Sequence, residues 1–168
     1  LERLAETETP QHPIEITDAT AADLEAIEEV ASSVFTTGRF LLDRRLPSEL
    51  SHRRYARWVR TSLDSSNQKV LKAEIGGDLV GFFIVERRDD GSAYWHLTAV
   101  SPDSQGKGIG MSLWRTMLLR HLAEGVTSVE TTVSGHNLAV MNLYARLGFV
   151  FSDAQMTFHW LRDAEAPP

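Results

Sequence analysis

The sequence of 168 residues contains no cysteine. It also has no apolar run of the roughly 18 residues that a membrane span needs. The missing cysteines exclude disulfides, thiolate metal sites and a cysteine nucleophile, and we expect no metal. The missing span, with a start unlike a signal peptide, leads us to expect a soluble cytoplasmic protein that does not enter a membrane. Basic residues are also fewer than acidic ones: the sequence has 17 Lys and Arg and 23 Asp and Glu, which gives a formal net charge of -6. This balance argues against a general nucleic-acid binder.

The chain has enough apolar material for one core. With 42% hydrophobic residues, a chain of this length can bury one sizeable core, and no change in composition marks a linker. We expect a single domain over residues 14–162, after a flexible, glutamate-rich arm over residues 1–13 and before a short tail over residues 163–168. A homodimer is compatible with this organisation.

Residues 93–122 indicate a strand, a glycine-rich turn and a helix. The aromatic and β-branched run Tyr94–Val100 predicts the strand, and Gln105–Gly110 opens a helical pattern that continues with Met111, Trp114, Leu118 and Leu122. Glycines let backbone N–H groups converge on an anion at the positive end of the helix, and Lys107 adds a cation. The alternative is a helix entry in which the glycines only permit a tight turn. Walker A and dinucleotide loops are excluded because Met111 follows Gly110.

Two segments carry a resemblance to a known superfamily. Gln105-x-x-Gly108-x-Gly110 after a Val-x-Pro turn resembles the acyl-CoA pyrophosphate loop of the GNAT superfamily of N-acetyltransferases, and residues 137–149 resemble its later helix and helix exit. The resemblance covers residues 14–161 and is strongest over residues 97–149. It implies acetyl-CoA, or another acyl-CoA, as cofactor, held by Thr98, Ala99, Val100, Gln105, Gly106, Lys107, Gly108, Ile109, Gly110, Met111, Asn137 and Tyr144.

The remaining pattern predicts an α/β (α+β) fold with a mixed, mostly antiparallel sheet flanked by helices. A short strand over residues 14–16 precedes a helix that begins with a capping box, Thr20 and Asp23, and a second helix begins at Pro47 and Ser48. The second helix has an apolar stripe of Leu50, Tyr55, Val59 and Leu63.

Three runs over residues 69–75, 79–85 and 92–100 then form a meander through two glycine-containing hairpin turns. A strand over residues 128–133 follows a helical crossover and is therefore expected to lie parallel to Tyr94–Val100. The resemblance implies that these two strands splay apart. A short helix over residues 137–147 and a closing hairpin, residues 149–151 with 156–161, complete the predicted fold.

Acetyl transfer needs an acceptor amine without its proton, a held oxyanion and a stabilised leaving thiolate. By resemblance Tyr144 is the acid next to the CoA sulfur, whereas packing in the core is its alternative role. The base of ribosomal-protein-type relatives corresponds to Thr132 here, so that assignment does not transfer. Glu130, His96 and Glu86 are the candidate bases, and a water chain or an amine that arrives neutral remains open. The oxyanion donor would be a backbone N–H near Ala99 or Val100.

The acceptor side is marked by positive charge. Residues 39–60 contain seven arginines and two acids, a local formal charge of 7 − 2 = +5. Either this is a basic face that balances the acidic first helix, or some of these arginines bind an anion. A weaker resemblance to bacterial enzymes acting on amino-sugar nucleotides marks the substrate-binding candidates Arg39, Phe40, Asp43, Tyr55, Trp58 and His159.

The predicted function is N-acetyl transfer from acyl-CoA to a primary amine of a small acceptor, with an anionic amino-sugar nucleotide as one candidate. The alternatives are a peptide, amino acid or antibiotic amine, an acyl donor on a carrier-protein pantetheine, and a CoA-binding module without catalysis.

Overall fold

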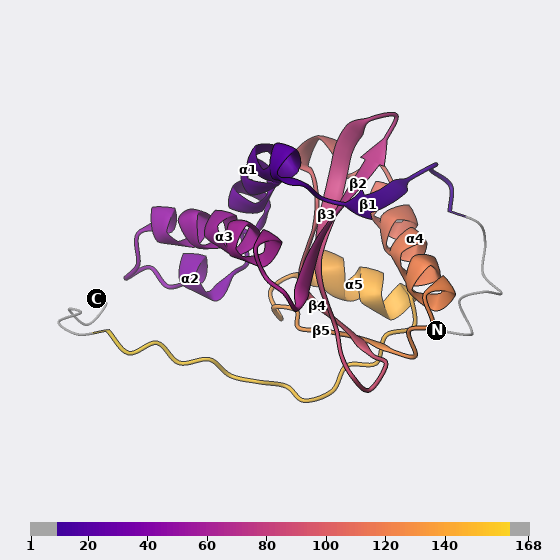
Figure 1. The fold of residues 1–168 in the computed structure, drawn as a ribbon. Helices are drawn as coiled ribbons and strands as arrows, with labels where there is room; N and C mark the ends of the chain where they lie inside the picture. The colour runs from indigo at the N-terminus through magenta and orange to yellow at the C-terminus, as the bar shows by residue number, and fades with distance from the viewer. Residues whose placement is uncertain (1–9, 162–168) are drawn as a thin grey trace.

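The computed structural model describes residues 10–161. Its centre is a five-stranded sheet in the order β1-β2-β3-β4-β5 (Figure 1), which confirms the predicted mixed sheet. The strands are β1 (Glu15–Asp18), β2 (Gln68–Ile75), β3 (Asp78–Arg87), β4 (Ala93–Val100) and β5 (Val129–Thr131). The first four are antiparallel neighbours, and β5 lies parallel to β4 as the crossover rule predicts.

The helices form two layers, one on each face of the sheet (Figure 1). One layer holds α1 (Leu24–Val34), the single turn α2 (Arg39–Leu42) and α3 (Ser48–Leu63). The other holds α4 (Ile109–Ala123) and α5 (Leu138–Arg146). Two 3₁₀ turns, η2 (Ala21–Asp23) and η3 (Pro102–Ser104), precede α1 and α4. None of the described helices is long and apolar enough to span a bilayer.

The predicted capping box is present, and its Asp23 also bonds the start of α1 to strand β2. Asp23 Oδ2 accepts a hydrogen bond from the Thr20 amide at 2.8 Å, and Asp23 Oδ1 accepts one from Lys72 Nζ on β2 at 2.9 Å. The bonds from Lys72 and from the Thr20 backbone lower the pKa of Asp23 to about 2. Asp23, which belongs to a local capping box, therefore also makes a long-range contact between α1 and β2.

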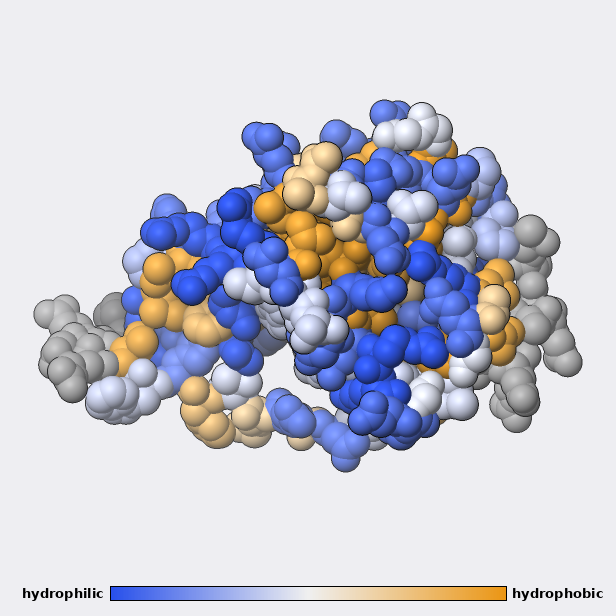
Figure 2. All heavy atoms as spheres, viewed as in Figure 1, coloured by the Kyte–Doolittle hydropathy of each residue, from blue (hydrophilic) through white to orange (hydrophobic). Residues whose placement is uncertain are grey.

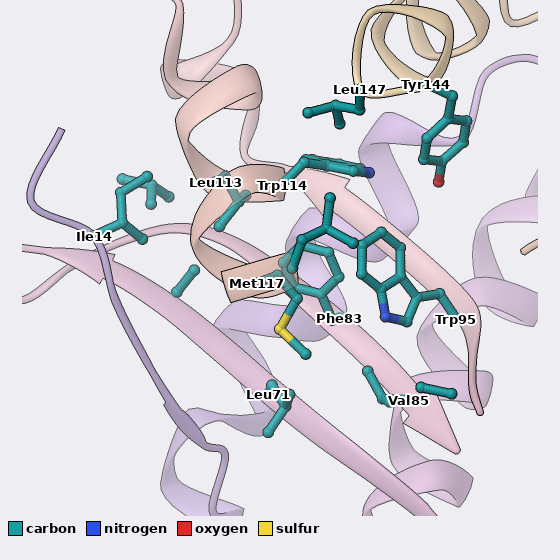
Figure 3. Packing of buried hydrophobic residues seen from close by; sticks show 14 of the residues in the cluster. Ile14, Leu71, Phe83, Val85, Trp95, Leu113, Trp114, Met117, Tyr144 and Leu147 are labelled. Atoms are coloured by element: carbon teal, nitrogen blue, oxygen red, sulfur yellow. The ribbon is translucent and has the colours of Figure 1, made fainter. Parts of the chain in front are cut away.

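Because neighbouring residues of a strand point to opposite faces, β3 contributes to two separate cores. Phe83 packs against α4 and α5, with its ring centre 5.2 Å from that of Trp95 and 5.3 Å from that of Trp114 (Figure 3). Phe82 faces the other way and packs with Ile27 of α1 and Val59 of α3. The sheet is thus covered on both faces, and β4 lies between the two helix layers.

Two predictions about the second helix and the strand after the crossover are wrong in detail. Leu50 is 49% exposed, because the buried stripe of α3 is Ser51, Tyr55, Val59 and Ser62, at spacings of four, four and three residues. The strand predicted over residues 128–133 is only Val129–Thr131.

The predicted closing hairpin is wrong. Residues 149–161 contain no strand and run as an extended segment from the end of α5 past β5 toward α2 and α3 (Figure 1). The three residues of β5 offer a very short edge to pair with, and Asp153, with φ 51°, interrupts the extended backbone. We call residues 149–161 the C-terminal segment. The expected arm and tail lie largely outside the described residues, which leave out residues 1–9 and 162–168.

Candidate active site

The centre of the site is an opening between β4 and β5. The two strands pair only at Ala93, Tyr94 and Trp95, so the stretch from His96 to Val100 has no partner in β5. The pairing ends where the Thr131 hydroxyl donates a hydrogen bond to the Trp95 carbonyl at 2.9 Å. This is the splay that the superfamily resemblance implied.

A register shift in the β3–β4 pair falls at the same point. Ile84 is opposite Leu97 and Val85 is opposite Trp95, which leaves His96 as the extra residue of a β-bulge. Bulges bend a strand and redirect a side chain. Here the bulge turns His96 toward α3, where its ring centre lies 6.3 Å from that of Trp58.

His96 is held in a polar network. Its Nε2 lies 2.6 Å from Glu86 Oε2. Gln68, whose Oε1 accepts a bond from the Ser62 hydroxyl at 2.7 Å, has its Nε2 3.4 Å from the same imidazole nitrogen. This last contact is not a hydrogen bond when His96 Nε2 carries its hydrogen, because both nitrogens are then donors. With Glu86 as a carboxylate, Nε2 carries the hydrogen, which leaves Nδ1 as the lone-pair nitrogen. Among the described residues, Nδ1 has no hydrogen-bond partner. His96 and Glu86 therefore form a dyad with one nitrogen available to accept a proton.

Glu130 lies apart from this dyad. Its side chain is 58% exposed and pairs with Arg88 Nη1 at 2.8 Å. Thr132, the position where some relatives have their base, instead hydrogen-bonds the Tyr94 hydroxyl at 2.7 Å. Of the three candidate bases, the structure brings His96 and Glu86 together and leaves Glu130 in a surface ion pair.

Tyr144 lies on the other face of β4, in the α4–α5 core. It is 2% exposed, and its ring centre is 4.7 Å from that of Phe149 and 6.5 Å from that of Trp114. Figure 3 shows the ring reaching from α5 toward the sheet beside Trp114. Among the described residues its hydroxyl has no hydrogen-bond partner. The ring packs in the core, and the hydroxyl proton is free for another acceptor.

The predicted anion loop has the backbone that the glycines suggested. Gly106 and Gly108 have φ angles of 74° and 77°, and no atom lies within 4 Å of where a Cβ would be at either position. The helix begins at Ile109, and no side chain caps its first turn. Its first amides therefore stay available for an anion, beside the exposed Lys107. Gly110 and Met111 lie within the first helical turn.

The remaining predicted cofactor residues lie around this loop and the opening. Gln105 Nε2 donates to the Val100 carbonyl at 3.1 Å, which ties the loop to the end of β4. Thr98 and Ala99 lie in the part of β4 that pairs with β3 but not with β5, and Asn137 caps α5 by accepting from the Val140 amide at 3.2 Å. Gly81 could not be singled out from the sequence, although a Cβ there would lie 2.5 Å from the Ala99 carbonyl oxygen. Glycine at this position lets α4 pack close to β3 and β4.

The predicted acceptor residues do gather, and they do so around Phe40. The Phe40 ring centre lies 5.0 Å from that of His159 and 4.8 Å from the Arg54 guanidinium carbon. The same guanidinium carbon is 5.1 Å from the Trp58 ring centre and 5.4 Å from that of Tyr55. Trp58 also contacts His96, so this aromatic cluster leads from the C-terminal segment to the opening in the sheet.

Asp43 fastens the C-terminal segment to the helical layer. Its Oδ2 lies 2.9 Å from His159 Nδ1, and both of its oxygens accept bonds from the Arg45 guanidinium, at 2.8 and 2.7 Å. The bonds from Arg45 and then His159 hold the pKa of the Asp43 carboxyl well below its usual range. Asp43 is therefore ionised and already paired, so its role in this structure is to position His159.

The comparisons with known proteins fit this geometry. A model described as the acetyltransferase (GNAT) family matches residues 25–149. The chain belongs to this family. The mixed sheet with its flanking helices is thus the GNAT fold, and the domain is of the acyltransferase class, with acetyl-CoA as the cofactor of the family.

Three relatives illustrate the range of the family. The spore coat polysaccharide biosynthesis protein SpsD of Bacillus subtilis is 27% identical over 137 residues, or 82% of this chain and 47% of that protein. The L-2,4-diaminobutyric acid acetyltransferase of Nocardia farcinica is 33% identical over 132 residues, which cover 77% of this chain and 66% of that protein. The PaiA N-acetyltransferase of Thermoplasma acidophilum, solved with coenzyme A, has a TM-score of 0.63 at 20% identity and covers 84% of this chain and 92% of its own. The chain spans less than two thirds of the first two relatives.

Proposed function

We propose that this chain transfers an acetyl group from acetyl-CoA to the primary amine of a small, negatively charged acceptor. The observation that carries the proposal is the His96–Glu86 dyad, placed by a bulge where β4 and β5 separate. An imidazole whose other nitrogen is hydrogen-bonded to a carboxylate is suited to accept a proton from an ammonium.

The residues present fit the donor. The uncapped start of α4 and the open space over Gly106 and Gly108 suit a pyrophosphate, and Lys107 adds charge there. Thr98 to Val100 border the opening, and together with Asn137 at the start of α5 they would hold the pantetheine arm. Bound acetyl-CoA supplies an activated acetyl thioester whose carbonyl gains negative charge during transfer. The free edge of β4 near Ala99 and Val100 is the proposed source of the backbone N–H for that charge.

His96 and Tyr144 divide the proton transfers between the two faces of β4. His96 Nδ1 accepts the proton of the amine from the α3 side, and Glu86 stabilises the imidazolium through Nε2–H. Tyr144 gives its hydroxyl proton to the departing thiolate from the α5 side. A base and an acid on opposite faces of one strand can act on a single reaction in the opening between β4 and β5 without neutralising each other.

The acceptor enters over α2 and α3. Phe40, Trp58 and His159 provide aromatic surfaces, with the buried Tyr55 behind them, and Arg39 and Arg54 provide positive charge. An amino-sugar nucleotide fits this composition, and the similarity to a polysaccharide biosynthesis protein supports it. A cytoplasmic location and a homodimer remain predictions from the sequence.

A second candidate acceptor is an amino acid with a side-chain amine. It is favoured by the 33% identity to the diaminobutyric acid acetyltransferase. A carboxylate could occupy the same arginines, but the aromatic surfaces would then lack a partner.

The test is release of free thiol from acetyl-CoA by the purified chain with a panel of amines. The panel contains amino-sugar nucleotides, free amino sugars, diaminobutyrate, an aminoglycoside and an alanine-starting peptide. We expect turnover with an anionic acceptor and an N-acetylated product by mass spectrometry. CoA binding with no turnover on any amine would contradict the proposal and favour a CoA-binding module.

A further inference from the structure

A cavity lies between the α2–α3 unit and the C-terminal segment, apart from the opening in the sheet. Its volume is about 350 Å³, in the range of small-molecule sites. Its apolar walls are formed by three aromatic rings and three leucines, namely Phe40, Phe158, Trp160, Leu46, Leu50 and Leu161. Figure 2 shows hydrophobic surface on the α2–α3 end and again along the C-terminal segment, with an opening between them.

Arg54 brings positive charge into this cavity. Its guanidinium carbon lies 4.8 Å from the Phe40 ring centre and 5.1 Å from the Trp58 ring centre, and it forms no ion pair with the described residues. Burial lowers the pKa of Arg54 from its usual value, yet a guanidinium stays charged near neutral pH. Aromatic rings bind the faces of a guanidinium and leave its N–H edge for an anion.

Two other arginines of the stretch over residues 39–60, in contrast, are in ion pairs. Arg45 is neutralised by Asp43, and Arg60 forms two bonds of 2.8 Å with Glu28 of α1. Arg39, whose guanidinium carbon is 5.1 Å from the same Phe40 ring, likewise has no ion pair in the described part of the chain. Of the arginines in the +5 stretch, Arg39 and Arg54 are the two that lie over the Phe40 ring without an ion pair in the described part of the chain, and two such cations suit a dianion.

His159 adds a polar atom to the cavity wall. Its Nδ1 is taken by Asp43, whereas its Nε2 is buried and has no hydrogen-bond partner among the described residues. A buried polar atom without a hydrogen-bond partner is unfavourable, so a ligand that pairs with Nε2 is bound more tightly. A heterocyclic base or a sugar hydroxyl can do this.

We propose that this cavity binds the nucleoside phosphate end of the acceptor, with the base between its aromatic walls and the phosphate on Arg54. The assignment rests on the acetyl transfer proposed above and names its substrate class. A ring-bearing anion satisfies all three features, because the walls stack a base, Arg54 and Arg39 bind the phosphates, and His159 Nε2 pairs a polar atom. The amine then extends along Trp58 toward His96.

Calorimetric titration with uridine and adenosine diphosphate tests this site, with CoA present at saturation to block the α4 loop. We expect at least one diphosphate to bind, and to bind about tenfold or more tightly than its nucleoside or inorganic pyrophosphate. Arg54→Gln should raise its Kd about tenfold or more. Arg60→Gln removes the same charge from the same helix and should change the Kd by less than about twofold.

Leu50→Glu provides a second test if Arg54→Gln lowers the melting temperature, because Leu50 lines the cavity and is half exposed. It should also weaken diphosphate binding about tenfold, by repulsion. No binding of either diphosphate to the wild type, or equal losses in Arg54→Gln and Arg60→Gln, would overturn the site. Diphosphate binding without acetyl transfer to any amine would overturn the proposed reaction and leave the site. Acetyl transfer without diphosphate binding would overturn the site alone.

Discussion

His96 Nε2 and Glu86 Oε2 lie 2.6 Å apart across the one register shift between β3 and β4. The shift makes His96 an extra residue, and the contact with Glu86 fixes which imidazole nitrogen faces the substrate. Both residues are largely buried beside Trp58 and Tyr94, whose rings limit the movement of the imidazole. The dyad is therefore positioned by the backbone as well as by its hydrogen bond.

The first prediction separates the candidate bases. His96→Gln removes the proton acceptor and should lower kcat by about 10²-fold or more, within the usual range for general base catalysis, with the KM for acetyl-CoA nearly unchanged. Glu86→Gln should lower kcat less, because the imidazole remains. The kcat of Glu130→Gln should stay within about twofold of the wild type, because the Glu130 carboxylate is in a surface ion pair. Steady-state kinetics of the three variants measures these effects. A larger loss of kcat in Glu130→Gln than in His96→Gln would mean that Glu130, and not His96, is the base.

The second prediction concerns the acid. Tyr144→Phe keeps the ring that packs against Trp114 and Phe149 and removes a hydroxyl with no partner among the described residues. The melting temperature should therefore hardly change, while kcat falls by about 10²-fold with CoA affinity retained. Thermal denaturation and kinetics on the same preparation distinguish a catalytic acid from a residue that only packs in the core. A loss of stability with kcat intact would make Tyr144 a packing residue only.

The sequence could predict those parts of the fold that short-range chemistry determines. The Thr20–Asp23 capping box, the hairpin turn at Gly76 and Gly77, and the left-handed backbone at Gly106 and Gly108 each depend on a few adjacent residues with specific backbone preferences. Chirality then makes β5 parallel to β4. These features were correct because no distant residue had to be known.

The parts that failed or were missed depend on long-range packing. A bulge cannot be seen in an alternating pattern, so His96 and Glu86 were named separately and not as a dyad. The stripe of α3 was misplaced because two of its buried members, Ser51 and Ser62, are not hydrophobic. The contact of His159 with Asp43 joins residues 116 positions apart, and the predicted hairpin placed its segment in the sheet.

The third prediction tests the donor loop. Gly108→Val forces a β-branched residue to φ 77° and places its side chain in the open space over the loop. The KM for acetyl-CoA should rise about tenfold or more, equal to roughly 1.4 kcal/mol of lost binding. Gly76→Val is the matched control, since Gly76 has φ 60°, an equally open Cβ position and a place in the β2–β3 turn. An equal rise in KM in both variants would indicate general strain and not a lost binding site.

The fourth prediction follows from a buried histidine near the site. His121 is 1% exposed, and its Nε2 accepts a hydrogen bond from Trp95 Nε1 at 2.9 Å. Its Nδ1 lies 3.5 Å from Glu124 Oε2, and Arg120 and Arg87 also act on it. Burial lowers the pKa of His121 in spite of Glu124.

The folded state therefore resists protonation of His121, whereas the unfolded chain takes up this proton near pH 6.5. The free energy of unfolding should fall as the pH drops below about 6.5, by at most about 1.4 kcal/mol per pH unit from this group, until the lower folded pKa is passed. His121→Gln keeps an acceptor for Trp95 without a titrating group, so its unfolding free energy should depend less on pH between about 6.5 and 5. Urea denaturation at a series of pH values measures this difference. His136→Gln, at an exposed position, should leave the wild-type slope unchanged. Identical slopes for the wild type and His121→Gln would mean that His121 takes up its proton in the folded protein as readily as in the unfolded chain.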